Sequence, residues 1–431
     1  MRPVVMAPPA PRAGRELMLY HFFKWLQQHI QDVYDIDSPL RVFRYLSFRA
    51  TLAAITAMLV SIVLGPWLIR KLYALKIGQP IRKDECPPLH ALHRDKEGTP
   101  TMGGLLIVAA MIVPTLLWAD ILGPFVLLAV GATLWLGLLG AVDDYFKIRH
   151  RDSNGLRPRT KLAWQIGLGV LVGVVLVAMP APKPEYSTTQ LKLLQKLAKE
   201  DGREGEDGSP TEPDIRALIR KHKIEGYPKT LFVPFHRRPV VVLGAFYILF
   251  AALVITGSSN AVNLTDGLDG LAIGCSTAVA FVYIGISYAA GNFRLSDYLN
   301  IEFINGSGEL VIFLASMIGA GLGFLWFNAH PAQIFMGDTG SLALGGAIGT
   351  VALVVKKEFL LLIAGGIFVI EAASVMLQVA YFKWKRERLF RMSPLHHHFE
   401  MCGWSETKVT VRLWIIAMIF ALVSLASLKL Q

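Results

Sequence analysis

Long apolar runs recur along the sequence and constrain its fold more than any other feature. Each run approaches the ~20 residues that an α-helix needs to cross a hydrocarbon core of ~30 Å. About ten runs are present, at residues 49–69, 103–119, 124–142, 162–180, 239–257, 271–290, 309–327, 341–355, 359–382 and 411–429. They are continuous, whereas the strands of a membrane β-barrel alternate apolar and polar residues. The sequence therefore predicts an all-α polytopic membrane protein with about ten transmembrane helices.

The composition agrees with this membrane prediction. Hydrophobic residues make up 53% of the chain and charged residues only 17%, which excludes a soluble globular protein. The net charge is +11, and in a membrane protein such an excess is typical of basic cytoplasmic loops rather than of nucleic-acid binding. The cysteines, Cys86, Cys275 and Cys402, have no CxxC spacing, so we expect neither a zinc site nor a disulfide framework.

Lysine and arginine are unequally distributed between the two sets of loops that connect the apolar runs. One set carries most of them and comprises residues 70–102, 143–161, 258–270, 328–340 and 383–410. The short loops of the other set have only Arg294, Lys356 and Lys357. Because positive residues favour the cytoplasmic side, we expect the first set in the cytoplasm and both termini outside.

The chain divides into four regions. Residues 1–48 are expected to form an N-terminal extension and an interfacial segment, and residues 49–180 the first four transmembrane helices. Residues 181–238 are charged, with clusters of Pro, Gly and Glu, and we interpret them as a periplasmic accessory insert with two short helices. Residues 239–431 contain the last six transmembrane helices and the remaining polar loops of the predicted cytoplasmic side.

The first unusual polar cluster, Asp143-Asp144-Tyr145-Phe146-Lys147, follows the third apolar run. Asp143 and Lys147 share one helix face at i,i+4 spacing. Two adjacent carboxylates can hold a divalent metal or accept a proton, and the lysine can bind a phosphate. A solvated helix end of mixed charge is an equally compatible interpretation of this motif taken alone.

A second cluster, Asn263, Asp266 and Asp269, lies between two apolar runs. We interpret residues 263–270 as a tight loop between two transmembrane helices, with two glycines that permit close approach of the backbone. Carboxylates at the mouth of a membrane bundle are costly unless they face water, a metal or a substrate. The twelve-residue pattern of an EF-hand is absent, and an Asx-type turn between helices is the alternative.

A third cluster runs from Asn328 to Ser341. Asp338 directly precedes a Thr-Gly-Ser helix start, where free backbone N–H groups suit a phosphate. A carboxylate there also suits Mg²⁺, which usually takes one or two carboxylates together with substrate phosphates. In the alternative interpretation, Asp338 is the N-cap of the next helix.

Two further clusters lie on the same side. His396, His397 and His398 follow a basic run, and consecutive histidines suit contacts to a sugar or diphosphate better than one zinc ion, with surface exposure as the alternative. Lys96 leads into the glycine-bearing helix entry Gly98–Gly104, which lacks the Walker spacing but can bind phosphate. All five clusters lie on the predicted cytoplasmic side, and together they favour phosphoryl transfer.

The order of these motifs also carries a family resemblance. From about Phe43 to the C-terminus, the sequence closely resembles the bacterial phospho-N-acetylmuramoyl-pentapeptide transferases, within the polyprenyl-phosphate N-acetylhexosamine-1-phosphate transferase superfamily. The motifs that carry it are Gly98–Gly104, Asp143-Asp144, Asn263–Gly270, Phe335–Ser341 and Pro394–Glu400. The last motif resembles the muramoyl-pentapeptide branch specifically. The insert at residues 181–238 and the N-terminal extension depart from the family pattern.

The resemblance implies a reaction and a setting. Undecaprenyl phosphate and UDP-N-acetylmuramoyl-pentapeptide would give lipid I and UMP, in the first membrane step of peptidoglycan synthesis. The enzyme would depend on Mg²⁺, cross the bacterial inner membrane several times and carry its active site on the cytoplasmic face. The resemblance also suggests a homodimer.

It further implies roles for individual residues. Asp338 would be the metal ligand, Asp143 would deprotonate or orient the lipid phosphate, and Asp144 would support it. His396 joins these aspartates among the catalytic residues. The implied substrate-binding residues are Lys96, Thr101, Lys147, Lys161, Asn263, Asp266, Asp269, Asn328, Phe335, Gly337, Ser341, Gln378, His397 and His398.

Two other functions are compatible with parts of the pattern. A sister transferase would use UDP-N-acetylglucosamine, and the PLHHHFE run argues against it. An ion-coupled or proton-coupled transporter would also carry membrane carboxylates, but near the bilayer midplane on broken helices. Here the carboxylates lie at the ends of the predicted spans.

Overall fold

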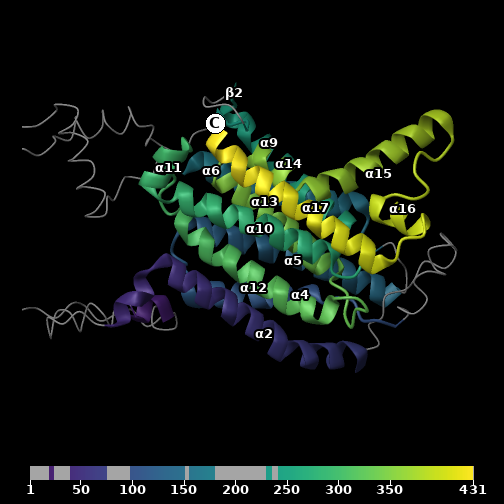
Figure 1. Ribbon diagram of the computed structural model, residues 1–431, viewed down its shortest axis with the longest axis horizontal. Coiled ribbons are helices and arrows are strands. Elements are labelled where there is room, and N and C mark those ends of the chain that lie inside the picture. The colour runs from purple at the N-terminus through teal and green to yellow at the C-terminus, as the bar shows by residue number, and fades with distance from the viewer. Residues whose placement is uncertain are drawn as a thin grey trace, which may run out of the picture.

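The computed structural model describes residues 19–23, 39–74, 98–150, 155–179, 230–234 and 241–430 (Figure 1). The regular structure of these residues is helical, apart from a short antiparallel pair between β1 (Thr230–Leu231) and β2 (Val241–Val242). The α-helices are α2 (Leu46–Ala74), α4 (Gly104–Trp118), α5 (Pro124–His150), α6 (Pro158–Ala178), α9 (Tyr247–Thr265), α10 (Leu271–Ala290), α11 (Phe293–Leu299), α12 (Leu310–Asn328), α13 (Gly337–Val354), α14 (Glu358–Ala364), α15 (Gly366–Lys385), α16 (Leu395–Met401) and α17 (Glu406–Ser427). Short 3-10 helices are η1 (Pro39–Arg44), η3 (Gly244–Phe246), η4 (Ser307–Glu309) and η5 (Leu428–Leu430).

Every apolar run of the sequence corresponds to a helix. Within the described ranges, nine helical segments are long and apolar enough to cross a membrane. The tenth, α4, has 15 residues and is about 22 Å long at 1.5 Å per residue, and it packs against α2 and α12. The prediction of an all-α polytopic membrane protein is confirmed.

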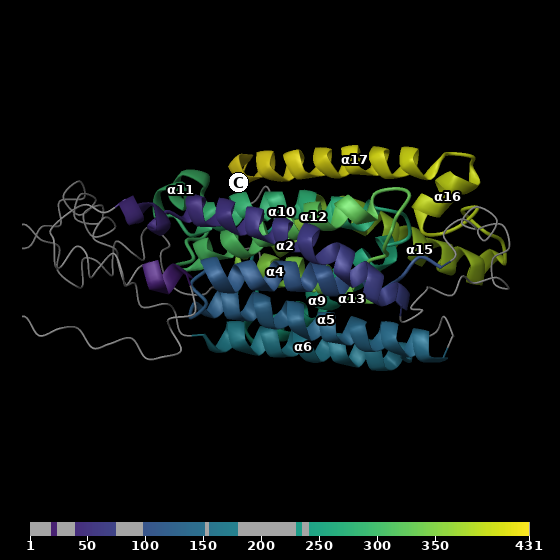
Figure 2. The same cartoon turned by 90° about the horizontal axis from the view of Figure 1, so that it is seen from below.

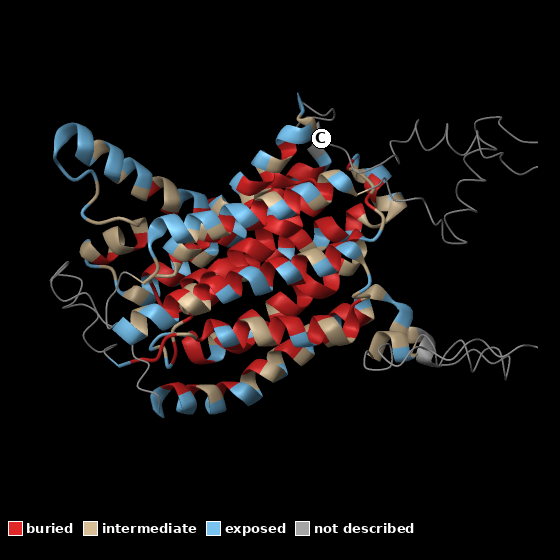
Figure 3. Ribbon diagram, turned by 180° about the vertical axis from the view of Figure 1, so that it is seen from behind, coloured by how far each residue is buried: buried red, intermediate tan, exposed pale blue. Residues whose placement is uncertain are grey.

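The most buried helices form the centre of the bundle. Nearly every residue of α13 is buried, as are most residues of α12 and α10 (Figure 3). Helix α5 packs against α13, α2 against α12, and α6 against α9. Figure 2 shows α17 along one surface of the bundle and α6 along the opposite one. The outer helices expose apolar side chains, such as Leu171 of α6 and Ile419 of α17, as expected of surfaces that face lipid, while polar groups on the central helices are enclosed by protein.

Several helix boundaries differ from the sequence prediction. The run 239–257 begins with β2 and η3, and α9 then continues to Thr265, so Asn263 lies in the last helical turn and not in a loop. Helix α9 extends because neighbouring helices satisfy its polar residues: Asn260 donates to Gln165 at 2.9 Å and Asn263 to Asp338 at 3.0 Å. The run 359–382 is interrupted at Gly365, between α14 and α15.

Glycines let the helices that carry the site approach one another closely. A Cβ on Gly140 of α5 would overlap the backbone at Asp338, and one on Gly104 of α4 would overlap the backbone of Gly340. Helices α4, α5 and α13 therefore meet with their backbones in contact at one end of the bundle. Larger side chains at either glycine would separate the elements that carry the polar clusters.

The two ends of the bundle differ. At one end, the exposed last turns of α15 project outward, and α16 lies beside α15 and α17 (Figure 1). The first described residues and the C-terminus both lie at the opposite end (Figure 1). Of the insert at 181–238, the structure describes only Thr230–Pro234, so the two helices expected there lie outside the described residues. The interfacial segment is described only at residues 19–23 and from 39 onward.

Candidate active site

Three carboxylates from two central helices meet at the end of the bundle where α15 projects. Asp143 and Asp144 lie on α5, and Asp338 lies in the first turn of α13. One oxygen from each lies within 4.8 Å of the others, a spacing suitable for a shared metal ion. All three residues were predicted to belong to the site, and the structure brings them together. Asp338 lies inside α13 and not at its N-cap, which is Met336.

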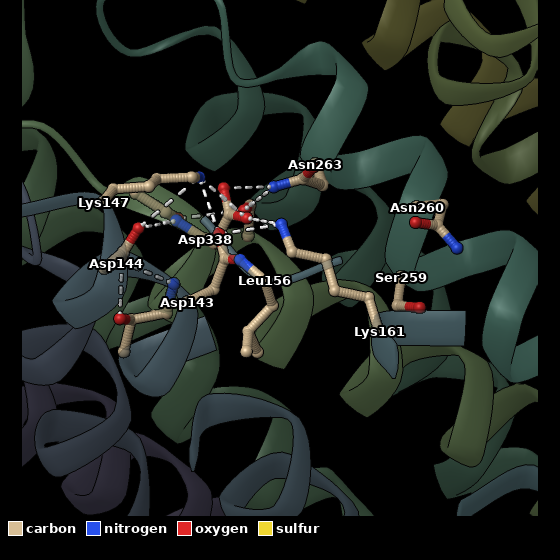
Figure 4. Close-up of polar contacts among 12 residues, drawn as sticks. Asp143, Asp144, Lys147, Leu156, Lys161, Ser259, Asn260, Asn263 and Asp338 are labelled. Atoms are coloured by element: carbon tan, nitrogen blue, oxygen red, sulfur yellow. Dashed lines mark hydrogen bonds and ion pairs between the residues drawn. The ribbon is translucent and has the colours of Figure 1, made fainter. Parts of the chain in front are cut away.

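Two lysines approach these carboxylates from opposite sides (Figure 4). The ammonium of Lys161, in the first turn of α6, lies 2.6 Å from Asp338 Oδ2 and 2.7 Å from Asp143 Oδ2. The ammonium of Lys147 lies 2.8 Å from Asp143 Oδ2 and 3.1 Å from Asp338 Oδ2. The Asp143 side chain is fully buried, whereas both lysine side chains are about one quarter exposed. The lysines therefore connect buried carboxylates to the accessible end of the bundle.

Asp144 has a different environment from its neighbour. Its Oδ2 accepts hydrogen bonds from the backbone N–H of Thr339 at 3.0 Å and from the Thr339 hydroxyl at 2.7 Å. Its Oδ1 accepts one from the N–H of Asp338 at 3.2 Å. Gly337, with φ +71°, leaves room for this approach, because a Cβ there would lie 2.7 Å from Asp144 Oδ2. Asp144 thus caps the N-terminus of α13 from the neighbouring helix.

The cluster Asn263–Asp269 divides between two places. Asn263 donates to Asp338 Oδ1 at 3.0 Å and to Ser341 Oγ at 2.8 Å. Asp266, just beyond the end of α9, lies beside the backbone of Gly337. Burial, reinforced by the charges of nearby aspartates, raises the pKa of Asp266 to about 8.

Asp269 belongs to a second group on the same end of the bundle. Its Oδ2 lies 3.0 Å from His330 Nδ1 and accepts from the N–H of Ala332 at 3.1 Å. Glu406 of α17 accepts from the N–H of Asp269 at 2.8 Å, and its Oε2 lies 3.4 Å from His330. The sequence analysis gave no role to His330 or Glu406. Glu406 lies just after the motif Pro394–Glu400 in the sequence, but only the fold shows that it contacts Asp269.

Two predicted phosphate-binding motifs are hydrogen-bonded to each other. The N–H of Phe335 donates to Pro100 O, and the N–H of Gly103 donates to Phe335 O, each at 2.8 Å. Thr101 is buried, and its hydroxyl lies 2.9 Å from the position that a Cβ on Gly337 would take. The two motifs thus form one surface beside Asp338, whereas Lys96 lies outside the described residues.

Asn328 joins the loops behind this surface. Its Oδ1 accepts from the N–H of Gly270 at 3.0 Å, and its Nδ2 donates to Ile334 O at 2.8 Å. The side chain is buried, and both ends of its amide contact backbone. In this geometry Asn328 aligns the loop after α9 with the loop before α13.

The three histidines of α16 have separate partners. His396 is fully buried and its Nδ1 lies 3.2 Å from Glu371 Oε2 on α15. His397 Nδ1 lies 2.7 Å from Glu400 Oε2, and His398 Nδ1 accepts from the N–H of Arg391 at 3.2 Å. These three contacts are consistent with the expectation that the histidines do not bind one common metal.

Gln378, another predicted substrate residue, lies on the projecting part of α15. Its Oε1 accepts from the N–H of Phe390 at 2.8 Å. This contact ties the basic loop that leads to α16 back onto α15.

The sequence analysis missed several residues that shape the site. Thr339 binds Asp144, and the N–H of Leu156 donates to Asp143 Oδ1 at 2.7 Å. Glu371 gave one recognisable signal, because it is an acidic residue within an apolar run. The other two contacts leave no sequence signal.

The arrangement of charges determines what the site is able to bind. Three carboxylates and two ammonium groups leave one formal negative charge at the centre. Each lysine forms ion pairs with carboxylate oxygens, and its ammonium group, on a flexible side chain, is also suited to bind phosphate. Such a centre suits phosphate chemistry at the end of a membrane bundle.

Comparisons with known proteins agree with this chemistry. The model of glycosyl transferase family 4 matches residues 126–356, and signature 1 of the phospho-N-acetylmuramoyl-pentapeptide-transferases matches residues 96–108. The phospho-N-acetylmuramoyl-pentapeptide-transferase of Protochlamydia amoebophila is 44% identical over 413 residues, which cover 94% of this chain and 98% of the relative. The protein of the same name from Desulfotalea psychrophila is 46% identical over 96% of this chain and 100% of the relative. A third, from a Geobacter species, is 45% identical over 90% of this chain and 95% of the relative.

The matched residues include the carboxylates, both lysines and the loops around them, and the relatives align over nearly their whole length. The chain therefore belongs to the phospho-N-acetylmuramoyl-pentapeptide-transferase family and is a phosphoglycosyl transferase of the membrane.

Proposed function

We propose that the protein transfers phospho-N-acetylmuramoyl-pentapeptide from UDP-N-acetylmuramoyl-pentapeptide to undecaprenyl phosphate, giving lipid I and UMP. The observation that carries this proposal is the centre formed by Asp143, Asp338, Lys147 and Lys161 at the end of membrane-spanning helices. A site at the end of membrane-spanning helices would be accessible to a lipid phosphate from the bilayer and to a soluble nucleotide from water. The names of the relatives supply the identity of the sugar.

Mg²⁺ is the metal that fits this centre best. Its preferred ligands are hard oxygens, and it is usually held by one or two carboxylates and completed by substrate phosphates. The three aspartate oxygens offer such ligands, but Asp144 is committed to α13 and the lysines pair with the other two. We therefore expect Asp338, and not a complete protein cage, to hold the ion together with the diphosphate. When bound, Mg²⁺ would neutralise charge on the diphosphate and polarise its phosphorus–oxygen bonds.

The residues of the chain then have distinct tasks. An oxygen of the lipid phosphate forms a bond to the phosphorus that carries the sugar, and the bond from that phosphorus to the departing UMP breaks. Asp143, which lies beside two ammonium groups, accepts the proton of the lipid phosphate or orients it. Lys147 and Lys161 stabilise the charge that develops on the phosphates. Asp144 holds the N-terminus of α13, and with it Asp338, in position.

We assign the remaining predicted residues to the substrate. Asn263, Asp266, Asp269 and Phe335 are proposed to line the nucleotide end. The diphosphate and sugar are assigned to Lys96, Thr101, Gly337, Ser341, Asn328, Gln378 and His396–His398. Support for assigning them to the substrate comes from contacts that join some of them to the centre or to the loop before α13, such as Asn263 to Asp338 and Asn328 to Ile334.

We further propose the bacterial inner membrane as the location, with this end of the bundle in the cytoplasm. The support is the excess of Lys and Arg in the loops at this end. The segment 181–238 would then be a periplasmic accessory insert, and both termini would lie outside the cytoplasm. A homodimer is proposed from the family resemblance, and the mass of the purified protein in detergent tests it.

The test of the reaction is UMP release by the purified protein with undecaprenyl phosphate and UDP-N-acetylmuramoyl-pentapeptide. We expect release with Mg²⁺ and none after EDTA, with recovery when Mg²⁺ is restored. If the protein released UMP from UDP-N-acetylglucosamine instead, the proposed site would stand and the proposed sugar substrate would be wrong. A folded protein that releases UMP from neither donor would refute the proposal.

A further inference from the structure

A buried carboxylate in α15 has no assigned task in the reaction. Glu371 is 1% exposed and lies within a membrane-spanning helix. An ionisable residue at such a position is costly and usually pairs with another polar group that has a function. Its partner here is His396 on α16, which is 0% exposed.

Two contacts hold His396 to this carboxylate. Its Nδ1 lies 3.2 Å from Glu371 Oε2, and its backbone N–H donates to the same oxygen at 3.4 Å. The contact fixes both the ring and the start of a helix of only seven residues. Phe399 of α16 also stacks on Trp404, with ring centroids 4.9 Å apart. These contacts help to determine where α16 places its histidines.

The other nitrogen of His396 faces the loop after α9. A Cβ on Gly267 would overlap His396 Nε2 and lie 3.0 Å from its Cε1. Within the described part of the chain, neither ring nitrogen has a partner in hydrogen-bonding geometry, although Nδ1 lies within ion-pair distance of Glu371 and Nε2 lies beside Gly267. Buried polar atoms in native proteins normally have partners, so a buried nitrogen without one is a candidate ligand contact.

We propose that Glu371 is a positioning residue that orients His396 toward the nucleotide-binding loop. The ion-pair contact between Nδ1 and the carboxylate holds the ring with Nε2 directed at Gly267, within the loop Asn263–Gly270. Glu371 itself touches no substrate and acts only through the imidazole. The inference rests on the proposed function, because the proposed function assigns the loop Asn263–Gly270 to the nucleotide end of the donor.

A purely structural ion pair is the competing explanation. It predicts that loss of Glu371 lowers stability and all kinetic parameters together. Positioning predicts a selective effect on the donor, since the lipid phosphate binds at Asp143 and the lysines. The two explanations therefore differ in how kcat/KM changes for each substrate.

The primary experiment compares Glu371→Gln with a matched control, Glu358→Gln. Glu358 is also a buried glutamate, but it lies at the opposite end of α13, where Tyr247 donates to it at 2.5 Å. We expect Glu371→Gln to lower kcat/KM for UDP-N-acetylmuramoyl-pentapeptide about 10-fold and leave KM for undecaprenyl phosphate unchanged. Glu358→Gln should change neither. Equal effects of both variants on both substrates would overturn the inference.

Equilibrium binding supplies a readout that does not need turnover. Binding of UDP-N-acetylmuramoyl-pentapeptide without the lipid should weaken about 10-fold in Glu371→Gln and remain unchanged in Glu358→Gln. A wild-type protein that releases no UMP would refute the proposed function. A wild-type protein that is active, with normal donor affinity in Glu371→Gln, would refute the positioning role alone.

A double-mutant comparison tests whether Glu371 acts through His396. In a His396→Ala background, Glu371→Gln should cause no additional loss of donor affinity. An additive loss would show an independent role and overturn the inference. If Glu371→Gln does not fold, Gly267→Ala disturbs the same imidazole from the loop side and should selectively weaken donor binding. Unchanged donor binding in a folded Gly267→Ala protein would also overturn it.

Discussion

Two adjacent residues of α5, Asp143 and Asp144, show how neighbouring carboxylates acquire different tasks. Three donors from α13 satisfy Asp144, which is therefore part of the helix that it caps. Among the described residues, Asp143 accepts one backbone hydrogen bond, from Leu156, and otherwise faces two ammonium groups. The local sequence is the same for both, so the difference arises entirely from the direction in which each side chain points.

Substitution of the two aspartates should therefore have different consequences. Asp144→Asn replaces an acceptor oxygen by an NH₂ group that opposes the donors of Thr339, and we expect a loss of about 1–3 kcal/mol in unfolding free energy. Asp143→Asn should abolish turnover, and it should destabilise the fold less than Asp144→Asn does. Thermal unfolding and UMP release, measured on both proteins, test this. An Asp144→Asn protein that melts like the wild type would contradict the capping role.

Asp338 is expected to matter more for turnover than for folding. In Asp338→Asn the amide oxygen can still accept from Asn263, while the charge that faces Lys147 and Lys161 is lost. We expect at least a 100-fold loss of Mg²⁺-dependent UMP release from a folded protein. The Mg²⁺ concentration needed for half-maximal rate should rise in any residual activity. Near-normal rates would remove Asp338 from the mechanism.

The limits of sequence reasoning are clearest in the cluster Asn263, Asp266 and Asp269. Their three-residue spacing suggested one shared site. Spacing implies a common face only while a helix continues, and α9 ends at Thr265. Asn263 and Asp266 therefore reach Asp338 and Gly337, whereas Asp269 turns to His330. The aspartate pair and Asp338 were predictable because charged residues are rare in membrane spans, but their contacts were not.

Helix α6 carries Lys161 and depends on α9 for its position. Four residues further along α6, the buried Gln165 donates to Ser259 at 3.1 Å and accepts from Asn260 at 2.9 Å. Toward the other end, a Cβ on Gly173 of α6 would lie 2.7 Å from the Cα of Ile248. Close backbone packing against α9 thus positions the half of α6 that is remote from the site. Hydrogen bonds from Gln165 to α9 position the half that carries Lys161.

Loss of this polar contact should weaken the site without dismantling the bundle. Hydrogen bonds between membrane helices contribute about 0.6–2 kcal/mol, so we expect Gln165→Leu to lower kcat about 3–10-fold. Leu171→Ala, at an exposed position of α6, is the control and should retain full activity. Wild-type kcat in Gln165→Leu would mean that α6 holds Lys161 without help from α9.

Several of the observed helices extend beyond the apolar runs that predicted them. Every run predicted a helix, yet α5 continues past residue 142 to His150 and α9 to Thr265. The extra turns are polar and are stabilised by other helices: Asp144 binds α13, and Asn260 binds α6. Hydropathy marks the portion inside hydrocarbon, while the functional turns lie just beyond it and depend on tertiary contacts.

At the scale of the whole molecule, the bundle carries a buried polar group at each end. The carboxylate–lysine centre lies where α13 begins. Lys356, Lys357 and Glu358 lie where it ends, and all three are nearly inaccessible. The Lys356 ammonium lies 3.6 Å from the centre of the Tyr247 ring, and Tyr283 donates to Lys357 O at 2.8 Å. This second group has contacts that suit a structural role, since it is remote from the motifs.

The buried lysine Lys357, at the end of α13 remote from the site, should make the free energy of unfolding rise with pH. Burial lowers the pKa of Lys357 to about 8, from 10.5 for an ordinary lysine, although Glu302 and Glu358 oppose this. Between these two values the unfolded chain binds a proton that the folded protein has released, so stability rises with pH. Below pH 8 the folded protein bears the full cost of a buried charge. Lys357→Met removes that cost.

We therefore expect Lys357→Met to melt above the wild type at pH 7, and the difference to shrink as the pH approaches 10. Lys356 and Glu358 are present in both proteins, so the comparison isolates Lys357. Melting temperatures in one detergent at pH 7, 8.5 and 10 provide the measurement, and Lys429→Met, at an exposed lysine, is the control without such a trend. A constant difference across this range would show that Lys357 has the same charge in the folded and unfolded proteins. UMP release should be unaffected at pH 7, because the substitution lies at the opposite end of α13 from Asp338.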